Sequence, residues 1–281
     1  MTGTLYIVGT PIGNLEDISL RALRALKECD CIAAEDTRHT IKLLNYYEIK
    51  TPLTAYHEHN KRVKGEDLLR QLKEGRNIAL VSDAGMPGIS DPGKELINLC
   101  YTCNITVTVV PGPTAVISGL VLSGMDSRRF VFEGFLPRDK KTRSDRLTEI
   151  SNETRTVVIY EAPHHIIETV GDLRKIDGHR QSALVREITK KFEEVILGDL
   201  DSLAIKLNAS PPVGEMVLIL EGVKPIEPQK EFPPDIKEHV DMYTQKGYEL
   251  KDAMKSAARD RGVSKREIYK MLLTGFGENG E

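Results

Sequence analysis

The feature that most constrains this chain is the regular alternation of short apolar runs with amphipathic segments over residues 4–110. The apolar runs have the length of strands, and the segments between them carry apolar residues at helical spacing. A repeated strand–helix–strand order predicts an open, mostly parallel sheet with helices on its faces. Because such sheets bind ligands beyond the carboxyl ends of their strands, we expect the residues just after Val8, Val81 and Val110 to line a site.

Loops rich in glycine and proline follow these three positions; they read GTPIGN (9–14), SDAGMPGISDPG (82–93) and PGPTA (111–115). The first loop fits neither G-x-G-x-x-G nor the Walker A pattern, so neither a nicotinamide nor an ATP site is supported. Pro113 or Thr114 is expected to begin a helix whose free N–H groups point into the crevice. Together the loops predict a backbone-lined pocket for a largely neutral or zwitterionic ligand, although the first loop alone is also compatible with a plain turn.

The rest of the chain divides into two further parts. Strand-like segments from Arg129 onwards, with fewer crossover helices between them, predict a second α/β domain with a mixed sheet. A stretch rich in Pro, Glu and Lys at 222–234 indicates a linker, and short helices separated by Gly-containing turns follow it, as in a helix-turn-helix. We therefore expect domains at 1–124, 126–222 and 235–276.

Composition leaves the partner open. Lys and Arg number 39 against 42 Asp and Glu, which gives a net charge of −3 and no basic excess over the whole chain. The C-terminal helices carry a small local basic excess, which suits either nucleic acid or an ordinary solvated surface. We find no apolar run of membrane-spanning length and no secretory signal, and so expect a cytoplasmic protein without a membrane contact.

The cysteines Cys29, Cys31, Cys100 and Cys103 form C-x-C and C-x-x-C pairs. A zinc site is one interpretation, but the wide separation of the pairs and the short first spacing favour small apolar residues at helix-to-strand junctions. His57-Glu58-His59 does not match the H-E-x-x-H spacing of a zinc protease. We expect no metal.

Seven motifs in one order carry a resemblance to a known family. They are GTPIGNL (9–15), AEDTR (34–38), SDAGMPGISDPG (82–93), VPGPTA (110–115), EGFLP (133–137), YEAPHH (160–165) and REITKK (186–191). On these motifs the chain resembles the small-subunit ribosomal RNA methyltransferase I family, within the tetrapyrrole-methylase-like enzymes that use S-adenosylmethionine. Met86 stands where that family commonly has Thr, and His165 where Arg usually follows the first His.

The resemblance implies an α/β fold: two α/β domains of the tetrapyrrole methylase type with the methyl donor between them, and a small C-terminal helical module. It further implies a homodimer that methylates the 2′-hydroxyl of a cytidine in the decoding region of 16S ribosomal RNA, in the small ribosomal subunit. The donor, S-adenosylmethionine, is then expected to contact Ile12, Asp83, Ala84, Gly85, Met86, Pro87, Ile89, Thr114, Ala115, Tyr160, Glu161, Val213 and Gly214.

Methyl transfer from a sulfonium depends mainly on positioning and desolvation, and a ribose hydroxyl gains from a base or a nearby cation. We expect Glu187 or Asp36 to accept the proton and Lys190 or Arg38 to supply the cation, with interdomain ion pairs as the alternative. RNA is expected on the C-terminal helices and on a basic segment comprising Arg138, Lys140, Lys141, Arg143 and Arg146. An assembled subunit should be a better substrate than a short oligonucleotide.

Three competing classes remain. A small-molecule methylase for a corrin-like macrocycle would share the loops but would not need a basic helical module. A DNA-binding regulator would explain that module but not the pocket loops, and a nicotinamide dehydrogenase would need the missing G-x-G-x-x-G. Transfer of a labelled methyl group to small subunits or to macrocycles separates these hypotheses.

Overall fold

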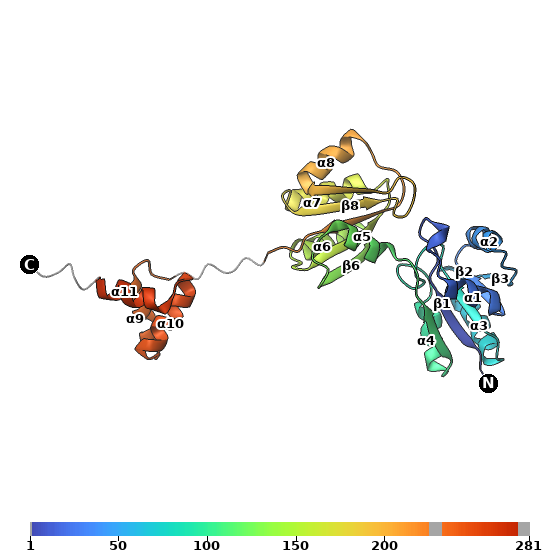
Figure 1. Cartoon of the computed structure of the whole chain (residues 1–281), viewed down its shortest axis with the longest axis horizontal. Coiled ribbons are helices and arrows are strands. Elements are labelled where there is room, and N and C mark those ends of the chain that lie inside the picture. The colour runs from blue at the N-terminus through green and yellow to red at the C-terminus, as the bar shows by residue number, and fades with distance from the viewer. Residues whose placement is uncertain (1, 225–231, 275–281) are drawn as a thin grey trace, which may run out of the picture. The chain divides into compact units, whose positions relative to one another are not determined.

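The computed structural model describes residues 2–224 and 232–274, and the chain forms two compact units, Met1–Lys224 and Pro225–Glu281 (Figure 1). Residues 225–231 of the expected linker, and residues 275 and 276 of the expected helical module, lie outside the described residues. Each unit is described below by itself.

The first sheet of unit 1 is parallel throughout, as the strand–helix alternation predicts. Its spatial order is β3-β2-β4-β1-β5. The strands are β1 (Thr4–Val8), β2 (Cys31–Ala34), β3 (Leu53–Ala55), β4 (Ile78–Val81) and β5 (Thr106–Val110). The sequence pattern does not predict β3, because three residues are too few to show a period.

Helices cover both faces of this sheet. Successive residues of a strand point to opposite faces, so Val81 packs under one pair of helices and Leu80 under the other. The first pair contributes Leu26 and Leu44, and the second contributes Leu68 to the opposite core. The pairs are α1 (Leu20–Glu28) with α2 (Thr37–Tyr46), and α3 (Lys61–Lys73) with α4 (Lys94–Thr102). A short 3-10 turn, η1 (Leu15–Asp17), precedes α1.

The second sheet is mixed, as the sequence predicts. Its order is β6-β7-β10-β8-β9, with β6 parallel to β7 and the other pairs antiparallel. The strands are β6 (Phe130–Phe135), β7 (Thr156–Glu161), β8 (Gln181–Arg186), β9 (Glu194–Asp199) and β10 (Met216–Leu220). A bulge between Phe132 and Gly134 interrupts the register of β6 against β7.

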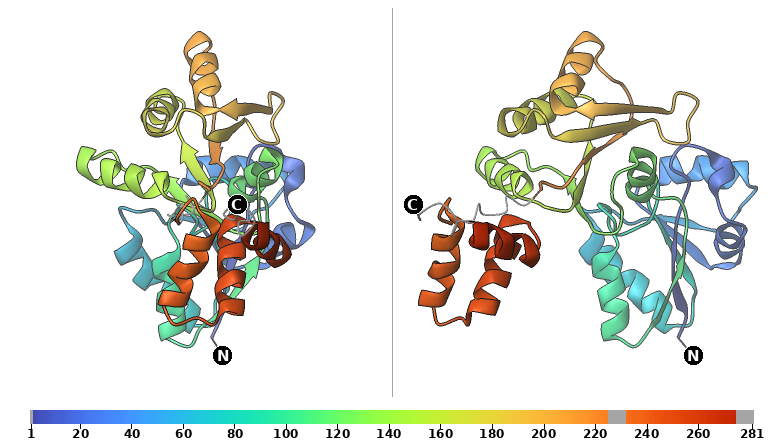
Figure 2. Two further views of the ribbon diagram at one scale, coloured as in Figure 1. Left: turned by 90° about the vertical axis from the view of Figure 1, so that its left-hand side faces the viewer. Right: turned by 60° about the vertical axis from the view of Figure 1, so that its left-hand side comes forward.

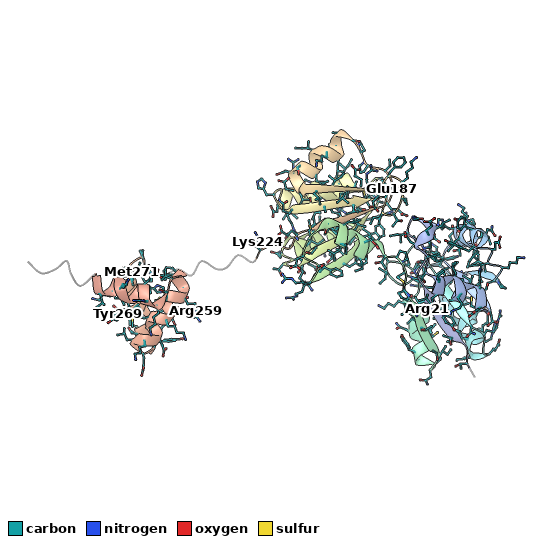
Figure 3. All side chains as sticks on the ribbon, viewed as in Figure 1. Arg21, Glu187, Lys224, Arg259, Tyr269 and Met271 are labelled. Carbon is teal, nitrogen blue, oxygen red and sulfur yellow. The ribbon has the colours of Figure 1, made fainter. Side chains whose placement is uncertain are left out.

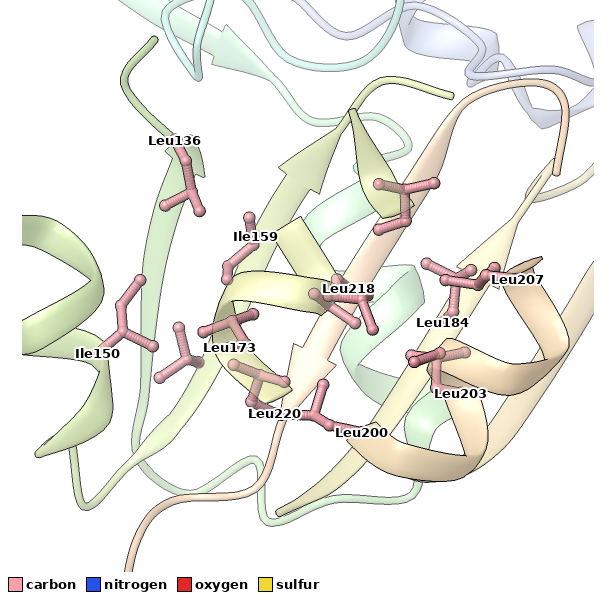
Figure 4. Packing of buried hydrophobic residues seen from close by; sticks show 14 of the residues in the cluster. Leu136, Ile150, Ile159, Leu173, Leu184, Leu200, Leu203, Leu207, Leu218 and Leu220 are labelled. Atoms are coloured by element: carbon pink, nitrogen blue, oxygen red, sulfur yellow. The ribbon is translucent and has the colours of Figure 1, made fainter. Parts of the chain in front are cut away.

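One face of the second sheet packs under three helices, which are α6 (Lys140–Ser151), α7 (Ile166–Ile176) and α8 (Leu200–Ala209). Figure 4 shows this core, in which Ile159, Leu184 and Leu218 lie between sheet and helices. Figure 2 shows the two sheets and their helices from two other sides. The alternation of the strands leaves Val158, Val185 and Val217 for the other face.

That other face is covered by α5 (Ala115–Ser123), the helix that follows the first sheet. Its Val116 and Leu120 join the core of the second sheet. A Cβ atom added at Gly119 would lie 3.1 Å from Val217, so the missing side chain lets the helix approach β10 closely. By packing, α5 therefore belongs with the second sheet, and the domain boundary at residue 124 stays a prediction.

The C-terminal unit contains α9 (Ile236–Gln245), α10 (Leu250–Arg261) and α11 (Lys265–Thr274) around a small core. Gly262 ends α10 in the left-handed conformation, with φ of 66°. Ser264 and Glu267 then form a reciprocal capping pair at the start of α11. The helix–turn–helix character of the sequence is therefore present, and the short turn is set by one glycine and one serine.

The cysteines lie at or near the ends of helices and strands, as predicted. Cys29 and Cys103 terminate α1 and α4, and Cys31 opens β2. Burial raises the pKa of the Cys29 thiol to about 11, which keeps it protonated at neutral pH. Among the described residues there is no group of three or more His, Cys, Asp or Glu side chains arranged to hold a metal ion. Within the same residues, no helix is both long and apolar enough to span a membrane.

Candidate active site

The three glycine- and proline-rich loops meet because β4, β1 and β5 are neighbours in the sheet. The amide of Thr10 donates to the carbonyl of Gly85 at 2.9 Å, and the amide of Gly85 donates back to Thr10 at 3.1 Å. The amide of Gly9 donates to the carbonyl of Val110 at 3.0 Å. The ends of the strands thus continue into a hydrogen-bonded rim, which fixes the shape of the loops.

Two glycines allow this close approach. A Cβ atom added at Gly9 would lie 2.8 Å from the backbone nitrogen of Gly112, and one added at Gly112 would lie 2.9 Å from the backbone of Gly9. No real side chain fits at such distances from backbone atoms. Gly85 is constrained differently: it has φ of +81° but only ordinary contacts around its missing side chain.

A cavity of about 280 Å³ opens between these loops and the second sheet. This volume is close to the lower end of the range for small-molecule sites, roughly 300–1,000 Å³. The predicted donor contacts on its wall are Ile12, Ala84, Gly85, Met86, Ile89, Thr114, Ala115, Tyr160 and Glu161. Lining residues that the sequence reasoning did not name are Ser90, Asp91, Phe135, Ala162, Pro163, Ile188, Glu215, Met216 and Val217.

Four predicted donor contacts are not on this wall. Asp83 accepts a hydrogen bond from the amide of Asp36 at 3.0 Å and lines a neighbouring recess. Gly214 lies against Glu187, with a left-handed φ of 87°, and Val213 beside it is exposed. Pro87 belongs to the second loop but does not line the cavity. Their contact with a donor stays a prediction.

The start of α5 forms one side of the cavity. Thr114 caps the helix, with its hydroxyl accepting from the amide of Ile117 at 3.4 Å, which confirms the predicted helix start. The amide of Val116 donates to the phenol oxygen of Tyr160 at 3.2 Å. Burial raises the pKa of Tyr160 to about 12, so this hydroxyl stays protonated.

Carboxyl groups concentrate beneath the second loop. Burial, followed by the charge of Glu35, raises the pKa of Asp91 to about 7. Burial and the charge of Asp83 likewise raise the pKa of Glu35. Since Asp91 lines the cavity, a cation bound there would stabilise its ionised form.

The segment after β8 carries one predicted catalytic pair. The ammonium of Lys190 donates to Glu187 Oε1 at 3.0 Å and to Glu215 Oε2 at 3.2 Å. Glu215 lines the cavity, whereas Glu187 lies beside it on the loop marked in Figure 3. Burial lowers the pKa of Lys190, but its hydrogen bonds to the two carboxylates outweigh burial and raise it. Lys190 is therefore a cation at neutral pH.

Backbone geometry holds this segment in place. Glu187 and Thr189 have φ values of 51° and 65°, which are strained for residues with side chains. A Cβ atom added at Gly13 would lie 2.6 Å from Lys190 Cγ and 2.8 Å from the carbonyl of Ile188. The loop after β1 therefore packs directly on the segment, and links the two halves of the site.

The other predicted catalytic pair is placed differently. Asp36 caps α2 and accepts from the Arg38 guanidinium at 2.7 Å, away from the residues that line the cavity. The hydrogen bonds from Arg38 lower the pKa of Asp36 to about 2, so it is a weak base. The Arg38 side chain is 89% exposed. Of the two pairs, the structure brings only Glu187 and Lys190 close to the cavity.

The predicted RNA-binding residues divide by their partners. Arg138, Lys140 and Lys141 are exposed at the start of α6. Arg143, whose side chain is only 14% exposed, donates to Asp172 and Thr169. Arg146 pairs with Glu133 and Glu149. The first three have their charges directed to solvent, whereas the last two are occupied within the protein.

Comparison with known proteins identifies the family. Residues 4–204 match the family model described as Tetrapyrrole (Corrin/Porphyrin) Methylases. The chain is 47% identical over 270 residues to ribosomal RNA small subunit methyltransferase I of Halalkalibacterium halodurans, covering 95% of this chain and 93% of that protein. This chain belongs to the ribosomal RNA small subunit methyltransferase I family.

A second member of the family matches only part of this chain. The ribosomal RNA small subunit methyltransferase I of Thermotoga maritima is 45% identical over 220 residues, which cover 99% of that protein and 78% of this chain. The unmatched part of this chain is close in length to Pro225–Glu281, the C-terminal unit.

Solved structures support the fold of the family. A uroporphyrin-III C-methyltransferase from Thermus thermophilus, solved in complex with S-adenosylhomocysteine, has a TM-score of 0.55 and 18% identity. The alignment covers 78% of this chain and 97% of that protein. This confirms the two-sheet tetrapyrrole methylase fold that the motifs imply.

The lining residues missed by sequence reasoning had visible signals. Ser90 and Asp91 lie in the same loop as the predicted contacts, and Phe135, Ala162 and Pro163 lie in quoted motifs. By contrast, Glu215 and Met216 precede or begin an ordinary apolar strand. Only the pairing of β10 with β7 brings them to the cavity.

Proposed function

We propose that this chain transfers a methyl group from S-adenosylmethionine to the 2′-hydroxyl of a cytidine in the decoding region of 16S ribosomal RNA. The observation that carries the proposal is the 47% identity to a small-subunit ribosomal RNA methyltransferase over 95% of the chain. The choice of the cytidine 2′-hydroxyl rests on the resemblance in the seven motifs. Because small ribosomal subunits are its substrate, we place the enzyme in the cytoplasm.

The cavity suits a sulfonium donor. Its walls combine apolar side chains with backbone at Gly85 and at the start of α5. The carboxyls of Asp91 and Glu215 on the wall suit the net positive charge of the donor. When bound, the donor supplies an activated methyl group: its sulfur–carbon bond breaks as the oxygen–carbon bond forms, and the hydroxyl proton leaves.

The chain's own groups then position the hydroxyl and handle its proton. We assign Lys190 as the cation that stabilises the developing negative charge on oxygen, because its two carboxylate partners keep it protonated beside the cavity. Of the two predicted proton acceptors we assign Glu187, because its hydrogen bond to Lys190 places it beside the cavity, whereas Asp36 is bound to Arg38 away from the cavity wall. Arg38, the other predicted cation, is already paired with Asp36, so we give it no separate role.

RNA phosphates require cations that the protein does not already neutralise. Arg138, Lys140 and Lys141 fit this role better than Arg143 and Arg146. In the C-terminal unit, Lys265 and Arg266 are exposed in the first turn of α11. Tyr269, which is labelled in Figure 3, is exposed one turn later. We propose both surfaces as RNA contacts, and 1–124, 126–222 and 235–276 as the domains that carry them.

We also propose a homodimer that buries the outer face of α5. Ile117 and Val121 lie one turn apart on this helix and are 49% and 69% exposed, with Leu122 partly exposed beside them. Three large apolar residues within two turns make an apolar patch of the kind that marks protein contacts. A second copy of the chain would cover this patch.

The test is transfer of a labelled methyl group to purified small subunits that lack the modification. We expect one 2′-O-methylcytidine per subunit, located by nuclease mapping, and no transfer to a corrin or porphyrin. Transfer to the macrocycle instead would favour the small-molecule methylase. If the label were found on a base atom, ribosomal RNA would remain the substrate, but the 2′-hydroxyl would be excluded as the methyl acceptor.

A further inference from the structure

A second recess adjoins the donor cavity. It has a volume of about 320 Å³ and shares Phe135, Glu161 and Ala162 with the cavity wall. Its other lining residues include Arg138 and His165. The two hollows therefore meet at the end of β6, and a molecule in the recess would lie next to a molecule in the cavity.

Phe135 stands at this junction and is 57% exposed. The bulge between Phe132 and Gly134 shifts the register of β6 immediately before it. Gly134 has φ of +65°, and a Cβ atom there would lie 3.3 Å from Ser90 Oγ. A bulge of this kind re-aims the next side chain, which explains how a large aromatic ring at a strand end comes to line both hollows.

The ring of Phe135 packs against other aromatic rings of the second sheet. Its centroid lies 5.6 Å from that of Tyr160, tilted by 59°, and Tyr160 lies 4.9 Å from Phe132 in an edge-on contact. The amide of Val116 fixes the Tyr160 hydroxyl. Phe135 is therefore supported by two partly buried aromatic rings, while much of its own surface is exposed.

Beneath the recess a chain of hydrogen bonds leads to the donor cavity. Arg143 Nη2 donates to Thr169 Oγ1 at 3.0 Å, and Thr169 donates to Glu161 Oε2 at 2.6 Å. Glu161 Oε1 accepts from the amide of Ala162 at 2.9 Å. Arg143 is thus a structural support. Arg138, exposed and without a hydrogen bond or ion pair in the described structure, is the cation available to a ligand.

We propose that this recess binds the acceptor nucleotide, with its base stacked on Phe135 and its phosphate paired with Arg138. The inference rests on the proposed function and specifies where its RNA substrate enters. A nucleotide inside helical RNA cannot reach a recessed donor, so it must leave the stack, and an exposed aromatic ring then replaces a neighbouring base. An apolar ring beside a free guanidinium matches the base and the phosphate of one nucleotide.

The experiment compares Phe135→Ala, Phe135→Trp and wild type as full-length chains. The matched control is Tyr101→Ala, which removes an aromatic ring that is 61% exposed on α4 and lines neither hollow. Methyl transfer to small subunits gives KM and kcat, filter binding gives subunit affinity, and calorimetry gives donor affinity. Circular dichroism establishes that each variant folds.

For Phe135→Ala we expect KM for the subunit to rise about 5- to 150-fold, the loss of one base–aromatic stack. Because Phe135 also lines the donor cavity, donor affinity should fall, but by much less than the rise in KM for the subunit. Phe135→Trp should restore KM, and Tyr101→Ala should match wild type. A loss of donor affinity equal to the rise in KM would mean that Phe135 serves the donor alone and would overturn the proposal, as would an unchanged KM and subunit affinity. Absence of transfer by wild type would instead reject the proposed function.

Arg138→Ala tests the phosphate contact. It should weaken subunit binding and reduce the slope of log affinity against log salt by about one. The control is Arg62→Ala, which removes an exposed arginine of α3. Equal slopes for wild type and Arg138→Ala would remove the phosphate from the proposal.

Discussion

The phenol oxygen of Tyr160, at the end of β7, accepts a hydrogen bond of 3.2 Å from the amide of Val116 in the first turn of α5. This bond fixes the start of α5 beside the donor cavity, and it holds the tyrosine ring against Phe132 and Phe135. One hydroxyl thus contributes to both hollows of the site.

Tyr160→Phe removes the acceptor but keeps the ring. A single hydrogen bond contributes about 1 kcal/mol, so we expect S-adenosylmethionine to bind about fivefold more weakly. Calorimetry on the variant measures this directly. An unchanged Kd would mean that the bond does not position the start of α5 for the donor.

The raised pKa of Asp91 predicts that the stability of the folded chain depends on pH. Its pKa is raised to about 7 in the folded chain, so the unfolded chain releases its proton first as the pH rises above about 4. Stability therefore falls between about pH 4 and pH 7 and the loss is complete above that range. Asp91→Asn should be more stable than wild type at pH 8, by up to about 4 kcal/mol for a shift of about three pKa units, but not at pH 4; urea unfolding at the two pH values measures this.

The same carboxyl predicts a pH dependence of donor binding. Above pH 7 Asp91 is ionised and attracts the sulfonium, whereas below pH 6 it is protonated. S-adenosylmethionine affinity should therefore rise between pH 6 and pH 8, and the neutral thioether product should respond less. If Asp91→Asn kept the full pH dependence, another group would have to be responsible.

Gly9 and Gly112 should not tolerate alanine. Each added methyl would meet backbone within 3 Å, so we expect either substitution to cost about 1–3 kcal/mol of stability and to weaken donor binding. Gly171→Ala is the control, because its α7 position is open and alanine favours helix by about 0.5–1 kcal/mol. Thermal unfolding should therefore show a lower Tm for Gly9→Ala and Gly112→Ala, and a higher Tm for Gly171→Ala.

Lys190→Met should lower kcat for methyl transfer by about 10²-fold, the usual loss when a group stabilising a developing oxyanion is removed. Lys191→Met removes the adjacent exposed lysine and should leave kcat near the wild-type value. Equal rates for the two variants in single-turnover assays would exclude Lys190 as the catalytic cation.

Val121→Glu tests the proposed dimer surface. A carboxylate in the α5 patch should convert the dimer into a monomer in sedimentation experiments, because a buried unpaired charge opposes association. Ile205→Glu, at a similarly exposed position on α8, should leave association unchanged. A monomeric wild type would contradict the dimer at once.

Local sequence patterns were sufficient to predict that the first sheet is parallel, that the second is mixed and that three loops follow the strand ends, but not the order of the strands. The apolar runs ending at Val8, Val81 and Val110 are long enough to show strand character, and glycine and proline mark where each run stops. These are short-range properties, so a linear reading finds them. The methyl donor and the RNA substrate were predicted from the family resemblance in the seven motifs.

Only the tertiary structure could decide which of the chemically plausible groups share the site. Asp36 and Glu187 are equally plausible bases in the sequence, but Arg38 lowers the pKa of the first, and strand pairing brings the second near Glu215. Likewise, the bulge after Phe132 turns Phe135 toward the junction of the two hollows. Such outcomes depend on contacts between residues far apart in the chain, and on burial, neither of which is encoded in the spacing of neighbouring residues.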